Sequence, residues 1–429
     1  MALWVISLND TELRVFRDGA LVDASPGVAV IGTHEILTGS AAQARRFLEP
    51  RNVRNRFWQQ LNQAPLAEST PRCRHHADLA YHHLAAILAR CGRPTEAVLA
   101  VPAHYGKDEL ALLLGIAGAL GLGVAGLVDG SVAALAGCAP RGRYVVAELF
   151  QHHATLVEID VGDSVVRGHV ETIEPAARGR IEAGLIDLVA DAFLDQARFD
   201  PLHDAASEQL LHDCLPGWLA RVNGGTAALE VALDYRGQRF TAQVPVREIE
   251  RITAMVLGAI AERVPRERTL VLAAPLGALP GTPRLFAPSL TLAGDAIALG
   301  IAAHRLAFGA ARGGTAFVTE LPATRSPSLA RDADAAATPL AVTHLLHGSH
   351  ARALGPTPLA LARAVGDGQS VAGRDGAAVS VIDGRAVLEP GAEPVTVNQR
   401  AVAARVVLNA GDRITLADGL TSYVAIHVS

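Results

Sequence analysis

The chain has 429 residues, half of them hydrophobic and 19% charged, a composition that excludes a largely disordered protein. Its formal net charge is −5, so no overall basic field directs it to nucleic acid or to an anionic membrane surface. The four cysteines are scattered without a CxxC pair, and the N-terminus has no basic leader, which together favour a reduced, cytoplasmic protein.

The first third of the chain alternates between strand-like and helix-like patterns. Predicted strands cover residues 3–8, 13–17, 21–23, 27–31, 97–101 and 124–128. Predicted helices cover residues 41–48, 77–91 and 108–120. Residues 110–128 are uncharged and long enough for a membrane span, but glycines interrupt this run, and each glycine inside a helix costs about 1 kcal/mol. A membrane-spanning segment is therefore not expected.

The middle of the chain repeats this alternation. Predicted strands cover residues 144–149, 155–161, 165–171, 226–235, 238–244 and 269–274, and predicted helices cover residues 184–197, 205–222, 246–263 and 295–307. Residues 309–339 are rich in Ala, Gly, Pro, Ser and Thr, which predicts a flexible linker. Residues 340–429 show short strands between Gly and Asp turns, which predicts a small all-β sandwich. The expected fold is α/β, with its strand–helix pattern built twice, followed by this β domain.

Several short motifs occur in one order along the first 308 residues. They are PGVAVI (26–31), LTGSAA (37–42), EPRN (49–52), AVPA (100–103), AALAG (133–137) and AGDAIALGIA (293–302). In this order they resemble the nucleotide-binding domain of the Hsp70 chaperones. The resemblance implies a two-lobed, actin-like ATPase fold over residues 1–308. Lobe I would comprise about 1–142 and 286–308, and lobe II about 143–285.

The phosphate-binding loops of that family are altered in this chain. ATP hydrolysis in such a fold needs glycine turns whose backbone amides approach the phosphates, and a carboxylate for the Mg²⁺-bound waters. Where the family has IDLGTT, residues 6–11 read ISLNDT: Ser7 replaces the carboxylate, Asn9 replaces the glycine, and Thr11 ends the motif. Where it has DLGGGT, residues 148–153 read ELFQHH, and the bulky residues after Glu148, including His152 and His153, are expected to project into the phosphate space.

The remaining nucleotide contacts are altered as well. Ala274 and Pro275 replace the glycine pair on the adenosine side, Asp129 keeps an acidic position, and Trp58 lies near the position of the family's catalytic lysine. These positions define a vestigial nucleotide cleft with no catalytic residue and no metal site, and neither ATP nor Mg²⁺ is expected to bind. The histidine pairs 75–76 and 82–83 lie nearly two helical turns apart, too far to share one metal ion.

The C-terminal part has a resemblance of its own. The segments HLLHGSHARAL (344–354), PLALAR (358–363), VTVNQR (395–400) and LNAGDRITL (408–416) look like an FHA domain, a family that binds phosphothreonine. Arg363 matches that family's phosphate-binding arginine, whereas the serine and histidine of its SxxH motif are absent around Arg374. Asn398 and Arg400 complete the corresponding loop surface.

Both resemblances predict a degenerate domain. The expected function is therefore that of a non-catalytic, Hsp70-like scaffold or adaptor with protein partners, an Hsp70 or a J-domain protein among them. Two alternatives remain open. One is a weak ATPase in which Glu148 and Asp129 place Mg²⁺; the other is a phosphopeptide-recognition adaptor that acts through Arg363.

Overall fold

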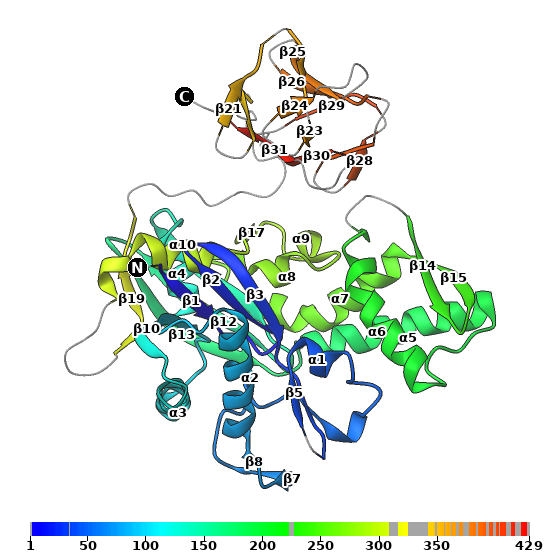
Figure 1. The fold of residues 1–429 in the computed structure, drawn as a ribbon. Coiled ribbons are helices and arrows are strands. Elements are labelled where there is room, and N and C mark those ends of the chain that lie inside the picture. Colours follow the sequence, from blue (N-terminus) through cyan, green and yellow to red (C-terminus); the bar gives the residue numbers. More distant parts are fainter. Residues whose placement is uncertain are drawn as a thin grey trace. The chain divides into compact units, whose positions relative to one another are not determined.

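The computed structural model describes residues 2–33, 35–222, 227–308, 316–324 and most of 342–426. Within that last range it does not describe residues 348–349, 356, 362, 366–368, 372–376, 383–384, 392–393, 398–399, 403, 409–412 and 417–421. The chain divides into two compact units, Met1–Asp332 and Ala333–Ser429, and the described helices lie in the first (Figure 1). Within the described residues, no helix has the length and apolar character needed to cross a membrane. The protein is of mixed α/β class.

The first sheet of unit 1 has two parallel strands at its centre. In spatial order its strands are β18 (Phe317–Val318), β10 (Gly123–Asp129), β9 (Glu96–Val101), β1 (Trp4–Ser7), β2 (Glu12–Arg17) and β3 (Ala20–Pro26). β1, β2 and β3 form an antiparallel meander, whereas β9 runs parallel to β1 and β10 parallel to β9. β9 is apolar and buried from Ala97 onward, as expected for a central parallel strand.

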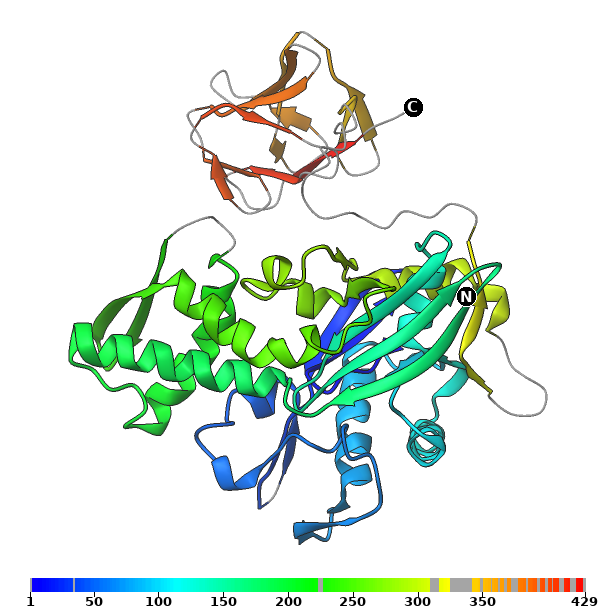
Figure 2. The same cartoon turned by 180° about the vertical axis from the view of Figure 1, so that it is seen from behind.

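The second sheet of unit 1 repeats this topology. In spatial order its strands are β17 (Leu290–Thr291), β16 (Thr269–Leu272), β11 (Gly142–Leu149), β12 (Ala154–Val161), β13 (Ser164–Ile173) and β19 (Glu320–Pro322). The long strands β11, β12 and β13 form the antiparallel meander, and they face the viewer in Figure 2. β16 runs parallel to β11, and β17 parallel to β16. In each sheet, one parallel strand thus pairs with the first strand of a three-stranded meander, and a second parallel strand pairs with that one.

Two short helices that pack on each other follow equivalent strands of the two sheets. α4 (Gly130–Ala136) follows β10 and is entirely buried, and α10 (Ala296–Ala303) comes after β17. Their backbones approach closely because glycines face each other at Gly137 and Gly300. A Cβ atom on Gly300 would lie 1.7 Å from the carbonyl oxygen of Ala133, a distance that no side chain tolerates. The contact therefore depends on glycine at position 300.

Smaller elements extend from each sheet. Between β3 and β10 lie β4 (Ala29–Ile31), β5 (Ile36–Thr38), α1 (Ser40–Gln43), η1 (Pro50–Asn52), β6 (Val53–Arg54), β7 (Pro65–Thr70), β8 (Cys73–His75), α2 (His76–Arg90) and α3 (Lys107–Ala119). From β13 to the end of the first unit's helices lie α5 (Arg178–Ala197), α6 (Ala205–Leu219), β14 (Ala228–Tyr235), β15 (Gln238–Pro245), α7 (Val246–Ala261), α8 (Ala274–Gly277), α9 (Thr282–Leu285) and η3 (Arg305–Ala307). The β14–β15 hairpin lies with α5, α6 and α7 at one end of unit 1 (Figure 1). Its turn has positive φ at Arg236 (49°) and Gly237 (78°), as a tight hairpin requires.

The described residues of unit 2 form strands only. They are β20 (His344–His347), β21 (His350–Ala353), β22 (Leu359–Ala360), β23 (Arg363–Val365), β24 (Gln369–Val371), β25 (Ala378–Ile382), β26 (Arg385–Glu389), β27 (Val395–Val397), β28 (Arg400–Val402), β29 (Val406–Val407), β30 (Arg413–Leu416) and β31 (Ser422–Ile426). These strands form sheets of six, four and two strands, and every described pair is antiparallel. Buried apolar residues, Val379, Leu388 and Ile414 among them, form one core in this unit.

Two predictions about local structure are wrong. The helix predicted at 41–48 ends at Gln43 as α1, because the chain turns there and the backbone amide of Phe47 donates to the side chain of Gln209 instead (3.0 Å). The linker predicted at 309–339 is wrong for residues 316–324, since β18 adds to β10 of the first sheet and β19 to β13 of the second. The rest of that range lies outside the described residues. Short apolar segments at sheet edges gain backbone hydrogen bonds that composition alone does not reveal.

Candidate functional site

A cavity of about 340 Å³ opens among the carboxyl ends of the central strands of both sheets. Its walls include the ends of β1, β9 and β11, the residues after β16, and the start of α4. Ligands of α/β proteins commonly bind at the carboxyl ends of parallel strands. Six of the predicted cleft residues line this central cavity: Ser7, Asn9, Thr11, Glu148, Ala274 and Pro275. The other three, Asp129, His152 and His153, lie outside its walls.

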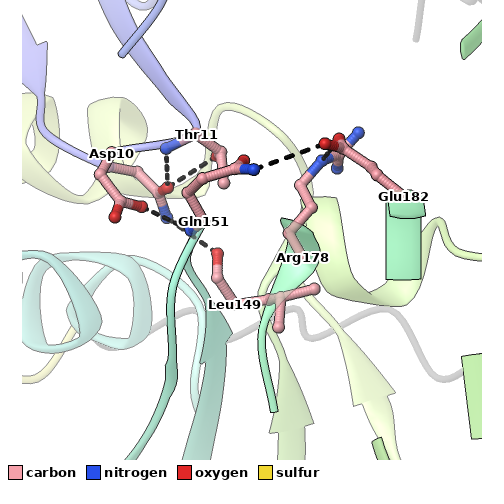
Figure 3. Close-up of polar contacts among 7 residues, drawn as sticks. Asp10, Thr11, Leu149, Gln151, Arg178 and Glu182 are labelled. Carbon is pink, nitrogen blue, oxygen red and sulfur yellow. Dashed lines mark hydrogen bonds and ion pairs between the residues drawn. The ribbon is translucent and has the colours of Figure 1, made fainter. Parts of the chain in front are cut away.

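The two turns that correspond to the phosphate loops are hydrogen-bonded to each other. Asn9 Nδ2 donates to the carbonyl oxygen of Leu149 (3.2 Å), and the backbone amide of Gln151 donates to Asp10 Oδ1 (2.7 Å) (Figure 3). Asn9 also orders its own turn, because its Oδ1 accepts from the backbone amide (2.9 Å) and the hydroxyl (2.7 Å) of Thr11. We call the Asn9–Leu149 and Asp10–Gln151 bonds the turn clamp. The clamp joins the β1–β2 turn of the first sheet to the β11–β12 turn of the second.

Asp10 is buried beneath the turn clamp. The residue is 5% exposed, and its second oxygen, Oδ2, has no hydrogen-bond partner among the described residues. Burial raises the pKa of Asp10 from 3.8 to about 7, against the opposing effects of the Gln151 hydrogen bond and the Arg56 guanidinium. The clamp therefore holds a carboxyl group that titrates near neutral pH.

The second turn also rests on the start of α5. The backbone amide of Gly179 donates to the carbonyl oxygen of Gln151 (3.0 Å). A Cβ atom at Gly179 would lie 2.8 Å from Gln151 Nε2, so glycine permits this approach. Arg178 Nε donates to Glu182 Oε1 (2.8 Å), and Gln151 Nε2 donates to the other oxygen of Glu182 (3.5 Å) (Figure 3). The turn is thus fixed on two sides, by the clamp and by α5.

The aromatic rings of the second turn and its neighbour His152 lie outside the walls of the central cavity. The ring of Phe150 stacks on His153 (4.7 Å between centroids, 8° between planes), and His153 meets the edge of His104 (4.5 Å). His152 Nε2 is 3.0 Å from the carbonyl oxygen of Asn55. The expectation that the bulky side chains of this turn project into the phosphate space is therefore wrong for Phe150, His152 and His153, because packing the rings against one another removes apolar surface from water. Leu149 and Gln151 of the same turn do line the cavity.

The two packed histidines are neutral at pH 7. Burial lowers the pKa of His104 to about 3 and that of His153 to about 4, and each ring is affected further by a neighbouring histidine. Their facing nitrogens, His104 Nδ1 and His153 Nε2, are 3.5 Å apart. The other nitrogen of each ring is buried without a partner in the described part of the chain. This cluster has the packing of a core element.

Asp129 is engaged in structural contacts. Its Oδ1 caps α4 by accepting from the backbone amides of Ser131 (2.9 Å) and Val132 (3.1 Å). Its Oδ2 pairs with Arg167 Nη1 from β13 of the second sheet (3.1 Å). Burial raises the pKa of Asp129, while the cap bonds and Arg167 oppose that rise. Both carboxylate oxygens of Asp129 therefore bind other groups of the protein.

Glu148 is a half-buried carboxyl group in the cavity wall. Ser131 Oγ donates to its Oε1 (3.2 Å). Burial, and then the neighbouring Asp129 carboxylate, raise the pKa of Glu148 to about 7. At neutral pH a large share of this side chain is the uncharged acid, a poor ligand for Mg²⁺. Across the described residues, no group of three or more His, Cys, Asp or Glu side chains is arranged to hold a metal ion.

Trp58 belongs to a buried hydrogen-bond network. Its Nε1 donates to His83 Nδ1 (2.9 Å), and His83 Nε2 lies 2.8 Å from Ser25 Oγ. Because Nδ1 accepts from the indole, the proton of the neutral imidazole is on Nε2 and points to the serine oxygen. This polarity is opposite to that of a nucleophilic Ser–His pair, in which the histidine accepts from the serine. All three side chains are buried, so the network holds the fold together.

A contact between the segment after α1 and helix α6 closes one side of the cavity region. Phe47 stacks on His212 (3.6 Å between centroids, 15° between planes), and its backbone amide donates to Gln209 Oε1. Gln209 Nε2 donates to the carbonyl oxygen of Gln43 (3.0 Å). Gln43, Arg46 and Pro216 line the cavity next to this contact. This contact, Arg167 and Arg178 were not expected, since no motif marks them. Asp10 and Gln151 lie within the two altered loop motifs, but the motifs do not reveal their contacts.

The residues of the predicted FHA-like surface are only partly described. Arg363 begins β23 and Arg400 begins β28, which belong to the two-stranded and the six-stranded sheet of unit 2. Arg374 and Asn398 lie outside the described residues. The prediction of a phosphothreonine site through Arg363 therefore stays a prediction.

The comparisons with known proteins place the chain in no family. No family model matches it, and no curated protein sequence matches it. Conclusions about its function rest on the geometry of the site.

Proposed function

We propose that this protein is a non-catalytic, Hsp70-like pseudo-ATPase that serves as a scaffold or adaptor in a protein complex. On this proposal unit 1 is a two-lobed, actin-like fold, with one lobe built on each sheet. The strand order supports it, because the meander and the two parallel strands of the first sheet recur in the second. The glycine contact between α4 and α10 supports it as well, because these helices follow β10 of the first sheet and β17 of the second.

The turn clamp carries the proposal. Backbone amides of glycine turns must be free to point at phosphates if a triphosphate is to be held. In this chain the backbone amide of Gln151 already donates a hydrogen bond to Asp10, and the carbonyl oxygen of Leu149 accepts one from Asn9. A bound triphosphate would have to break these bonds and separate two turns that α5 also supports. A cleft that is fixed in one arrangement supports a structural role over a nucleotide-driven cycle.

The geometry counts against the weak-ATPase alternative. That alternative assigns Mg²⁺ to Glu148 and Asp129, but Asp129 uses both oxygens in the α4 cap and the Arg167 pair. Glu148 accepts a hydrogen bond from Ser131, and with a pKa raised to about 7 it is only partly ionised at neutral pH. A cation at this position would have to displace Arg167 or deprotonate Glu148 in a buried site, and each change costs free energy.

The partner can be tested by direct titration. Full-length protein is titrated with a purified Hsp70 and, separately, with a purified J-domain protein from the same organism, and complex formation is followed by analytical ultracentrifugation. The proposal predicts a complex with one of them. If the partner is the J-domain protein, the complex should form equally well with and without ATP, since this chain is not expected to bind nucleotide. Hydrolysis of ATP by the protein alone, lost in Glu148→Gln, would contradict the pseudo-ATPase assignment.

A further inference from the structure

We propose that the central cavity binds an amphipathic organic monoanion, a small monocarboxylate whose apolar body lies on the cavity floor and whose carboxylate pairs with Arg46. This inference goes beyond the scaffold function, which requires no ligand. It gives a ligand to a cavity that is present in this chain although the residues for holding a triphosphate are replaced.

The charges of the cavity wall leave one positive group uncompensated. Arg14 pairs with Glu12 (2.9 Å), and Arg178 pairs with Glu182 (2.8 Å), so these two arginines are neutralised locally. Arg46 also lines the cavity, and it forms no ion pair with any residue that the structure describes. Glu148, the remaining acidic group of the wall, has a pKa raised to about 7 and is only partly ionised at neutral pH. The wall therefore keeps a surplus of positive charge up to neutral pH, which matches a monoanion.

Arg46 is held where it can meet a ligand. Its guanidinium lies over the ring of Phe47 (5.2 Å to the centroid), an arrangement that fixes the side chain without neutralising its charge. The same guanidinium lowers the pKa of His212 and of His152, after burial as the larger cause in both, which places its charge between α6 and the second turn. An arginine presents several parallel N–H donors, and a carboxylate is the group that they fit best.

One part of the cavity wall, which we call its floor, is apolar. Ala134 of α4, Ile297 of α10, Leu292, Pro275 and Phe16 supply this floor. A volume of about 340 Å³ is within the range of small-molecule sites, and apolar walls with a few polar groups are typical of them. Glu148 as the uncharged acid adds one further hydrogen-bonding group beside the floor. A ligand with an apolar body and a single anionic end would contact both the apolar floor and Arg46.

The same features disfavour a polyanion. A triphosphate carries several negative charges, and the cavity offers one uncompensated cation. The clamp also uses a backbone amide that a phosphate chain would require. Selectivity between a monocarboxylate and ATP is therefore the property that distinguishes this proposal from a conventional nucleotide cleft.

Calorimetric titration of the full-length protein with straight-chain carboxylates, from butanoate to decanoate, tests the proposal. Octanoate is the reference probe, and 1-octanol and octylamine carry the same apolar body with a neutral or a cationic end. We expect saturable octanoate binding with one site per chain, weaker binding of 1-octanol, and no binding of octylamine. Arg46→Gln should weaken octanoate binding at least tenfold and remove its advantage over 1-octanol.

Two further variants locate the site. Ile297→Trp fills the apolar floor and should abolish binding, whereas Arg74→Gln, which removes an exposed arginine on β8, should leave the affinity unchanged. If Ile297→Trp does not fold, the comparison of octanoate with 1-octanol in Arg46→Gln still decides the matter. Absence of octanoate binding at millimolar concentration, or equal affinity in Arg46→Gln and the native protein, would overturn the proposal. Mg²⁺-dependent ATP binding would instead overturn the pseudo-ATPase assignment.

Discussion

Replacing Asp10 by asparagine should stabilise unit 1 in a pH-dependent way. Burial raises the pKa of Asp10 from 3.8 to about 7, so the folded protein holds this proton more tightly than the unfolded chain does. The stability contributed by the protonated group is complete below about pH 4 and is lost as the pH rises through 7. A shift of about three units, at 1.36 kcal/mol each, corresponds to a loss of about 4 kcal/mol. The asparagine side chain of Asp10→Asn does not titrate, and it keeps an oxygen that can accept from the Gln151 amide.

The free energy of unfolding of both proteins is measured by urea titration from pH 4 to pH 9. Tryptophan fluorescence reports unit 1 alone, because Trp4, Trp58 and Trp218 are the three tryptophans of the chain and all precede residue 332. The advantage of Asp10→Asn should grow by up to about 4 kcal/mol between pH 4 and pH 7 and then stay constant. Asp187→Asn, on the exposed face of α5, is the matched control and should show no such growth. A difference that is independent of pH would mean that the turn clamp is open in solution and that Asp10 is hydrated.

Two further predictions concern the packing that joins the halves of unit 1. Gly300→Ala places a methyl group 1.7 Å from the carbonyl oxygen of Ala133 and should lower the free energy of unfolding, measured by thermal unfolding, by about 3 kcal/mol or more. Gly258→Ala, in open space on α7, should raise it by about 0.5–1 kcal/mol, and equal effects of the two variants would refute the close helix contact. Arg167→Ala leaves the buried Asp129 carboxylate unpaired and should cost about 3 kcal/mol, of which adding Asp129→Asn should recover a part; a loss below about 0.5 kcal/mol would refute the pairing.

Local patterns in the sequence predict much of unit 1. The strands β9, β11 and β12 and the helices α2 and α7 lie within a few residues of their predicted bounds, because each has a clear apolar period and a turn at its end. The altered residues Ser7, Asn9 and Glu148 were assigned to one cleft from their resemblance to family motifs, and all three line the central cavity.

The contacts that fix the cleft could not be predicted in this way. The turn clamp joins residues about 140 positions apart, and neither asparagine nor aspartate in a turn signals which distant backbone group it will meet. The helix predicted at 41–48 failed because Phe47 leaves the helical pattern to stack on His212, a preference that depends on α6 being alongside. His153 is expected from its motif to project into the phosphate space, yet the ring cluster around Phe150 buries it. Tertiary contacts decided each of these cases.

Calorimetry of the purified full-length protein with ATP and Mg²⁺, combined with a thermal-unfolding series, is the measurement on which the pseudo-ATPase assignment depends. A ligand that binds only the folded state stabilises it by about 2.7 kcal/mol at 100 times its Kd, so a functional site would raise the unfolding temperature clearly. With the turns clamped through Asn9 and Asp10, we expect neither heat of binding nor a change in unfolding temperature at millimolar ATP. A saturable, Mg²⁺-dependent heat accompanied by a rise in unfolding temperature would contradict the account.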